Sequence, residues 1–364
     1  MKIAFAQDNL INGAKMNTIG KRSETILATI VSEYISTGEP VGSRTLSKKM
    51  DMGVSAATIR NIMSDLTDWG YISQPHVSAG RIPTDLGYRF YVDKILEPIG
   101  LNQQEIAAIE SWIAAAGMDI RDALKQSSWV LADLSKQAGV VSSSPAKEQT
   151  FKTIDFIKVA KDRILVVLVS TNGFVQNKMI FDDENISQDT LECCTRMLND
   201  MLKDLDLKEA KEKIEIELSH EKARFDIMLA TALRFGYMIL SDDKLAREIF
   251  IEGSANIVED PVFLQVDQIK AILVTFEHKS KLLKLLDKIL VTKGMQIFIG
   301  SEHGINEMES CSVIAYPIKT PGAVLGSISI IGPKRMNYQK IIPLVGTTAK
   351  VLTKLLKRIV ERDS

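Results

Sequence analysis

Apolar residues recur at helical spacing along the first part of the chain. From Lys21 to Thr37 they fall on one face, which predicts an amphipathic helix that ends at Gly38. A short helix capped by Ser43 is predicted next, then a turn that contains glycine, and then a helix that begins after Ser55. This last helix has an apolar stripe at positions i, i+3, i+4 and i+7, formed by Ile59, Ile62, Met63 and Leu66. Helix, turn and helix in this order predict a helix-turn-helix motif.

A β-hairpin is predicted directly after the third helix. Tyr71–Gln74 has the composition of a short strand, and Arg81–Pro83 that of a returning strand. The loop between them is rich in turn-forming residues, and Thr84 is a good N-cap for a helix over 85–96. A hairpin in this place is a wing, so residues 18–98 are predicted to form a winged-helix DNA-binding domain.

The outward face of the third helix carries small, polar and basic side chains. Arginine can pair with guanine and asparagine with adenine through two hydrogen bonds, which singles out Arg60 and Asn61. Cations of the second helix and polar residues of the hairpin are candidates for phosphate contacts. Taken alone, this stretch would fit an ordinary amphipathic surface helix equally well. The predicted DNA-binding residues are Ser43, Arg44, Lys48, Lys49, Ser55, Ala57, Thr58, Arg60, Asn61, His76, Ser78 and Arg81.

The charge of this region gives little support to DNA binding. Between Lys21 and Arg89 there are eight Lys and Arg residues against seven Asp and Glu residues, whereas a DNA-binding domain usually has a basic patch. Binding would therefore depend on where the charges are placed. Tyr88, Phe90 and Tyr91 beside Arg89 are compatible with a nucleic-acid platform, but their helical spacing favours a packing face onto the next domain.

Strand and helix patterns alternate in the rest of the chain. Helices are predicted over 101–139, with a break near Gly117, and Ser142–Pro145 is predicted to be a loop. Further helices are predicted over 187–205, 225–250, 266–290 and 338–359, and the highly charged stretch 208–221 is a solvated helix or a connector. Strands are predicted over 151–159, 164–169, 174–181, 295–299, 313–318 and 323–331.

Two strand blocks thus flank a mostly helical section. Because consecutive strands usually pair, the simplest interpretation is one α/β domain, formed by 99–222 and 293–364, whose sheet is completed after an insertion at 223–292. The apolar helices of the insertion need a partner surface, which a second subunit would supply.

Several stretches carry a specific family resemblance. The runs from Pro40 to Leu46, from Ser55 to Leu66 and from Gln74 to Asp93 resemble the HrcA family of bacterial heat-inducible transcription repressors, and the last run is twenty residues long. Shorter similar motifs are Pro261–Phe263, Ile299–Glu302 and Gly332–Tyr338, so that the resemblance covers about residues 20 to 358. His303 departs from it, because asparagine is expected there.

The resemblance implies an α+β multidomain protein with a winged helix-turn-helix and a GAF-like domain that is interrupted by a dimerising insertion. It also implies a homodimer that represses chaperone genes by binding an inverted-repeat operator, with a chaperonin as the partner that supports its activity. An alternative is a winged-helix regulator controlled by a small metabolite in the GAF-like domain. An enzyme and a scaffold that does not bind DNA are the weaker alternatives.

Composition narrows the class of protein. The 364 residues are enough for two or three domains, with a net charge of −1 and only three cysteines, two of them adjacent at Cys193 and Cys194. No apolar run approaches the ~20 residues of a membrane helix, and no signal peptide is evident, so a cytoplasmic protein is predicted. Residues 1–17 are predicted to be a disordered leader, and Met16 is an alternative start.

No catalytic or metal-binding constellation is predicted. The histidines at 76, 220, 278 and 303 have no metal-ligand spacing with one another or with the cysteines. Ser301 and His303 are adjacent but lack the strand-turn-helix setting of a nucleophile, so a solvated loop is favoured. Lys334 and Arg335 are expected in a tight turn before the last helix, capped by Asn337, with an anion or partner contact as the alternative. We therefore predict no enzyme and no cofactor.

Overall fold

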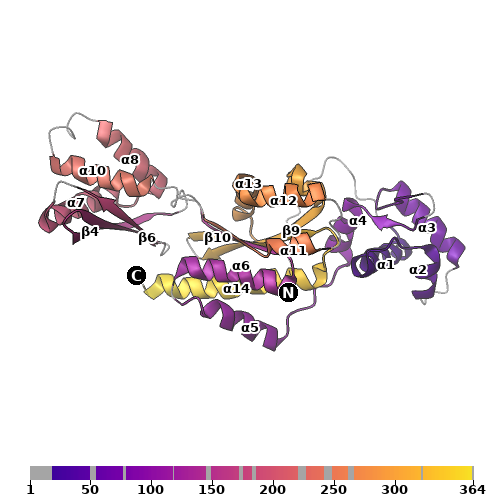
Figure 1. Ribbon diagram of the computed structural model, residues 1–364. Helices are drawn as coiled ribbons and strands as arrows, with labels where there is room; N and C mark the ends of the chain where they lie inside the picture. Colours follow the sequence, from indigo (N-terminus) through magenta and orange to yellow (C-terminus); the bar gives the residue numbers. More distant parts are fainter. Residues whose placement is uncertain are drawn as a thin grey trace.

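The computed structural model has mixed helix and sheet architecture, in agreement with the predicted α+β class. It describes residues 19–49, 55–76, 79–117, 119–144, 149–171, 175–182, 186–219, 227–241, 248–260, 266–320 and 323–362. The predicted leader and Ser78 lie outside these ranges. Figure 1 shows an elongated molecule with three lobes in a row.

The first lobe consists of α1 (Lys21–Thr37), α2 (Ser43–Lys49), α3 (Ala56–Asp68), β1 (Ile72–Ser73), β2 (Ile82–Pro83) and α4 (Asp85–Phe90), followed by a π-helical turn, η1 (Tyr91–Ile95). Strands β1 and β2 pair antiparallel, as predicted. The predicted caps are confirmed at Gly38, which is left-handed, and at Ser55 and Thr84. The predicted cap at Ser43 is wrong, because Ser43 is already helical and Gly42 O accepts the first helical bond, from Leu46 N.

The central lobe is built on a five-stranded antiparallel sheet with strand order β7-β3-β10-β9-β8. These strands are β3 (Ala138–Ser143), β7 (Ile249–Glu252), β8 (Gln296–Ile299), β9 (Cys311–Thr320) and β10 (Ala323–Pro333). The helices α5 (Gln103–Ala114), α6 (Ile120–Ser135) and α14 (Tyr338–Arg362) cover one face. The other face packs on α11 (Ser254–Glu259), α12 (Val266–Glu277), α13 (Ser280–Leu290) and a loop with short helical turns η4 (Gly300–His303) and η5 (Asn306–Met308).

The third lobe has its own sheet and its own core. Strands β4 (Phe151–Ala160), β5 (Arg163–Ser170) and β6 (Val175–Phe181) form a three-stranded antiparallel sheet. Helices α7 (Gln188–Leu202) and α10 (Ile227–Leu240) pack on one face, and α8 (Leu207–Ser219) packs on α10. The buried side chains of this lobe form a cluster separate from the central core.

The structure contradicts the prediction that the two strand blocks complete one sheet. Residues 151–181 pair only among themselves within the described residues, and the central sheet is completed instead by β3 and β7. The inserted unit is therefore the third lobe, spanning Phe151–Leu240, and the predicted boundaries at 99–222 and 223–292 do not follow the sheets. Helices α11 to α13 belong to the central lobe.

Both missed strands lack a strand pattern in the sequence. Ala138–Ser143 is buried along its whole length, so it does not alternate, and its serines suggested a loop. They are buried because they bond within the sheet: Ser142 Oγ lies 2.8 Å from Ser327 Oγ on the neighbouring strand. The four residues Ile249–Glu252 are too short for periodicity to separate a strand from the end of a helix.

The first lobe shares a hydrophobic core with the central lobe. One cluster of buried side chains runs from α1 and α3 through α4 to α6 and α14. Tyr88 lies within it, with its ring centroid 6.1 Å from that of Tyr338. The aromatic residues of α4 are thus a packing face onto the next domain, as favoured above.

Candidate nucleic-acid interface and its joint to the core

Helix α3 presents the polar face that the sequence predicts. Ser55 Oγ accepts a hydrogen bond from Thr58 N at 3.2 Å, which fixes the start of the helix. Ile59, Met63 and Leu66 are buried. Ala57, Thr58, Arg60 and Asn61 are exposed. The hydroxyls of Ser55 and Thr58 bond to each other at 3.1 Å, so their first role is to hold the helix end.

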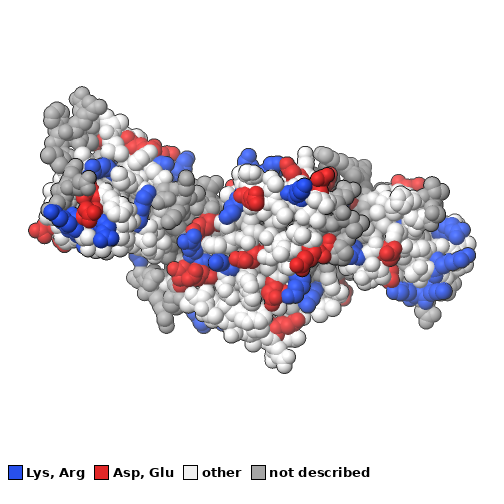
Figure 2. All heavy atoms as spheres, viewed as in Figure 1, with Lys and Arg blue, Asp and Glu red and all other residues white. Residues whose placement is uncertain are grey.

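The cations of α2 are exposed, but one of them is already paired. Arg44 and Lys48 lie on the surface, whereas Lys49 Nζ lies 2.5 Å from Glu33 Oε2 on α1. In Figure 2 Lys and Arg side chains gather at the end of the lobe that carries α2 and α3, away from the central lobe. The near-neutral total charge therefore conceals an uneven distribution. Asp85 and Arg89, one charge of each sign, are bound to the central lobe and leave the surplus of one unchanged.

The hairpin is tied to the helices at its base. Arg81 exchanges two backbone hydrogen bonds of 2.9 Å with Val41, and its Nε donates to Thr67 Oγ1 of α3 at 3.1 Å. Arg81 is half-buried, so it positions the hairpin against α3 rather than standing at its tip. His76 is exposed near the tip.

Arg89 connects α4 to the central lobe. Its guanidinium donates to both carboxylate oxygens of Glu302, to Asp93 Oδ1 at 3.1 Å, and to the carbonyl of Ile297. Glu302 also accepts from Ile299 N at 2.9 Å, so every group in this network has a partner. The Arg89 and Glu302 side chains are only 15% and 11% exposed, so solvent screens their attraction weakly.

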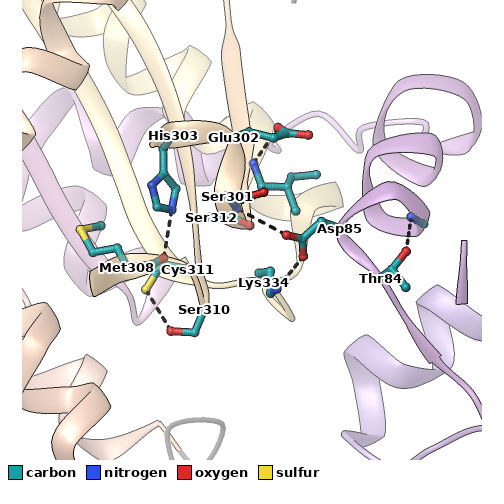
Figure 3. Close-up of polar contacts among 12 residues, drawn as sticks. Thr84, Asp85, Ser301, Glu302, His303, Met308, Ser310, Cys311, Ser312 and Lys334 are labelled. Atoms are coloured by element: carbon teal, nitrogen blue, oxygen red, sulfur yellow. Dashed lines mark hydrogen bonds and ion pairs between the residues drawn. The ribbon is translucent and has the colours of Figure 1, made fainter. Parts of the chain in front are cut away.

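A second set of contacts lies beside this pair. Asp85 Oδ1 accepts from Lys334 Nζ at 2.5 Å, and Asp85 Oδ2 accepts from Ser301 N at 3.4 Å (Figure 3). Gly300 has a φ of 57°, and the Asp85 carboxylate occupies the place where a Cβ would lie, so only glycine fits. Gly38 is a second such position. Its φ is 77°, and the Arg335 guanidinium occupies the place where a Cβ would lie.

We call these contacts of Gly38, Asp85 and Arg89 with residues 297–302 and 334–335 the joint. Sequence reasoning did not find the joint, because its partners are more than two hundred positions apart. The available signal was that the family-like stretches Gln74–Asp93, Ile299–Glu302 and Gly332–Tyr338 all contribute to it. Lys334 and Arg335 lie in a tight turn as predicted, and Asn337 Oδ1 accepts from Lys340 N at 3.2 Å just after it. The turn also makes a contact within the chain, because Lys334 pairs with Asp85.

His303 and Cys311 are buried structural groups. His303 Nδ1 accepts from Ile305 N at 3.1 Å and its Nε2 lies 2.9 Å from Met308 O (Figure 3), which fixes a neutral ring with the proton on Nε2. Burial lowers the pKa of His303 and raises the pKa of the Cys311 thiol to about 12. The prediction that His303 lies in a solvated loop is wrong, because the ring is enclosed.

Among the described residues, no group of His, Cys, Asp and Glu side chains is arranged to hold a metal ion. None of the helices in the described ranges has the length and apolar character needed to cross a membrane.

Comparison with known proteins identifies relatives along nearly the whole chain. The family model described as HrcA protein C terminal domain matches residues 121–342. The heat-inducible transcription repressor HrcA of Syntrophobacter fumaroxidans is 39% identical over 94% of this chain and 99% of its own length. The protein of the same name from Geobacter sulfurreducens is 40% identical over the same shares of the two chains. A crystal structure of a hypothetical protein at 2.2 Å resolution has the same overall fold, with a TM-score of 0.61 and 24% identity over 94% of this chain and 98% of that chain.

Replacing Arg89 by methionine should cost about 3–5 kcal/mol of the free energy of unfolding, because Glu302 would remain buried without its counter-charge. Adding Glu302→Gln should recover a large part of that loss, since the unpaired charge is then removed. Urea unfolding of the two single variants and the double variant measures this. Additive losses would show that the two side chains do not interact.

The lowered pKa of His303 predicts a loss of stability in acid. Unfolded histidine titrates near pH 6.5, so the contribution of the neutral ring is complete above that pH and is lost as the pH falls below it. His303→Asn should flatten the decline of the free energy of unfolding between about pH 7 and 5. The same substitution at the exposed His278 should not. If the free energy of unfolding fell with pH in the same way in the wild type and in His303→Asn, His303 would not be a neutral ring in the folded protein.

Proposed function

The chain belongs to the HrcA family, and on this premise we propose that it is a cytoplasmic, dimeric repressor of heat-shock chaperone genes. It binds an inverted-repeat operator through a winged helix-turn-helix, and a chaperonin modulates its activity. The family is one of transcription repressors and not of enzymes. The chaperonin and the chaperone genes come from the family resemblance, whereas the DNA contacts rest on the geometry of the first lobe.

The observation that carries the proposal is the exposed face of α3. A helix that starts at a capped Ser55 and presents Arg60 and Asn61 outward can enter the major groove with its first turns, where these two side chains have base partners. Helix α2 lies at the same end of the lobe as α3 (Figure 1), and its exposed Arg44 and Lys48 supply phosphate contacts. The hairpin then acts as the wing, with His76 near its tip and Arg81 holding its base.

An inverted repeat requires two copies of this lobe, related by a two-fold axis. We assign the dimer contact to the third lobe, because in the described residues helices cover only one face of its sheet. The other face exposes large apolar side chains at Ile157 (46%), Val175 (55%), Met179 (40%) and Phe181 (72%). Ile157, Leu165 and Met179 are paired across the three strands and form one continuous row.

An exposed apolar sheet face of this kind is costly in water and is typical of an interaction surface. Two copies packed face to face would cover it, with an isologous contact in which each residue meets its own counterpart or a neighbour. The central lobe, for which we retain the GAF-like assignment, then connects the dimer contact to the DNA-binding lobe.

Arg60→Ala should cost about 1–3 kcal/mol of affinity for the operator, which is about a 5- to 150-fold rise in Kd, as expected when a base contact is lost. Gel-shift titration on an inverted repeat measures the effect. The control Arg358→Ala removes an arginine of α14 that is also exposed and should leave the Kd unchanged. Equal affinities of the wild type and Arg60→Ala would exclude α3 as the recognition helix.

Arg44→Ala should weaken binding to every DNA sequence alike and lower the slope of log K against log salt by about one. Lys49→Ala should have a smaller effect, because Glu33 already neutralises Lys49. Salt titrations of each variant with operator DNA and with unrelated DNA measure both effects. A selective loss of operator binding in Arg44→Ala would mean that Arg44 contacts bases.

Phe181→Asp should convert the dimer into a monomer, because the carboxylate would be buried in the proposed contact. Sedimentation equilibrium of the full chain measures the mass, and circular dichroism verifies that the variant is folded. Ile216→Asp on α8 is the matched control, since Ile216 is also exposed (56%) but lies outside the sheet. A folded Phe181→Asp variant that remains dimeric would exclude this face.

A further inference from the structure

Arg81 lies at the base of the hairpin, and both its backbone and its side chain are held in place. The backbone exchanges two hydrogen bonds of 2.9 Å with Val41. Gly80, directly before it, allows this close approach, because a Cβ there would lie 2.6 Å from Pro40 O. The Nε group of Arg81 donates to Thr67 Oγ1 on α3 at 3.1 Å. The near end of the guanidinium is therefore fixed against the predicted recognition helix.

The Thr67 hydroxyl is oriented to accept this bond. It donates its single proton to Met63 O, one turn earlier in α3, at 2.7 Å. Its lone pairs are then left to accept, and the Nε–H of Arg81 uses one of them. Because the N–H groups of arginine form a rigid planar fork, one fixed bond at Nε restricts the direction of the whole guanidinium.

The far end of the Arg81 guanidinium has no partner within the described residues. None of them accepts a hydrogen bond from Nη1 or Nη2, and none places a carboxylate within ion-pair distance of Arg81. Arg89 in the same lobe is a contrast, because its Nε, Nη1 and Nη2 all bond to Glu302, Asp93 or Ile297. Arg89 thus has a role inside the chain, whereas two donor groups of Arg81 are oriented but available to an external anion.

This available end lies beside the α3 face that carries Arg60. Thr67 follows Arg60 by seven residues, so the two lie on the same side of the helix and about 10 Å apart along its axis. The major groove is about 12 Å wide. In the proposed complex, an Arg60 side chain that reaches a base edge therefore places Thr67 near the rim of the groove, where the phosphates are.

We propose that Arg81 is a pre-oriented ligand of one backbone phosphate of the DNA, and that Thr67 is the residue that positions it. Nε stays bonded to Thr67, while Nη1 and Nη2 donate to the phosphate oxygens. The contact rests on the proposed function and adds to it a residue of α3 that does not itself touch DNA. Because phosphates carry no sequence information, the pair contributes to the affinity for any DNA and to the placement of α3.

The phosphate contact is tested by gel-shift titration of the full chain at several salt concentrations. Arg81→Ala should raise the operator Kd and lower the slope of log K against log salt by about one, because one phosphate contact is lost. Arg81→Lys should also raise the Kd but leave the slope unchanged, since an ammonium keeps the charge and cannot bond to Thr67 and to the phosphate as a fork does.

The positioning role is tested at Thr67. Thr67→Val removes the acceptor and should raise the Kd by about 3- to 10-fold, because the arginine must then be ordered on binding. The salt slope should not change, since the cation is still present. Thr67→Ser keeps the hydroxyl and should bind like the wild type. In the double variant Thr67→Val with Arg81→Ala, binding should be no weaker than in Arg81→Ala alone, because Thr67 acts only through Arg81.

Thr29→Val is the matched control. It removes the same kind of hydroxyl bond to a carbonyl one turn earlier, 2.8 Å to Thr25 O, from α1 of the same lobe, and should bind like the wild type. Circular dichroism and urea unfolding verify that each variant is folded.

Equal salt slopes for the wild type and Arg81→Ala would overturn the phosphate contact. Additive losses in the double variant would overturn the positioning role of Thr67. Either result, with Arg60→Ala still impaired, would leave the proposed function intact. A wild type that binds no DNA at any salt concentration would overturn the proposed function and this contact together.

Discussion

The ion pair between Arg89 and Glu302 is the contact on which the arrangement of the lobes depends. It joins α4, the last helix of the first lobe, to the loop that follows β8 of the central sheet. The pair is largely shielded from water, so it is stable only while both charges are present. Asp85, Lys334 and the two glycines that allow close approach extend the same contact. A first lobe held in this way moves with the central lobe.

This arrangement gives each part of the chain a distinct place in the proposed mechanism. Helix α3, with the proposed DNA-binding face, and the sheet of the inserted lobe lie at opposite ends of the molecule in Figure 1. If two copies associate through the far lobe, the separation of the two α3 helices is determined by the central lobes and by the joint. A change in the joint therefore alters the fit to the operator without touching a residue that contacts DNA. The turn at Lys334 and Arg335 is well placed for such a change, since it touches both Asp85 and Gly38.

Local patterns were sufficient for the parts of the fold in which neighbours in sequence decide the structure. The apolar stripe of α3, the cap at Ser55 and the hairpin of β1 and β2 follow from spacing and turn chemistry, and all are present. The sequence was misleading at Ala138–Ser143, because a strand that is buried on both faces and pairs with β10 shows no alternation. It was also misleading at 151–181, since periodicity identifies a strand but not its partner.

The site shows the same limit. Exposure of Arg60 and Asn61 could be predicted from their place opposite the apolar stripe. The pairing of Lys49 with Glu33 and the burial of Arg89 against Glu302 could not, because charge patterns do not tell which acid lies next to which base across elements. His303 is a different case. Its partners Ile305 N and Met308 O are only two and five positions away, but an irregular turn has no periodicity from which the burial of the ring could be predicted.

The most direct test of the central claim is the dependence of DNA affinity on half-site spacing. The full chain is titrated with inverted repeats that differ only by the insertion of about half a helical turn, or five base pairs, between the half-sites. A joint that holds the DNA-binding lobe rigidly predicts at least a tenfold loss of affinity on this insertion, because one recognition helix then faces the wrong side of the duplex. Equal affinity for both spacings would contradict a fixed joint.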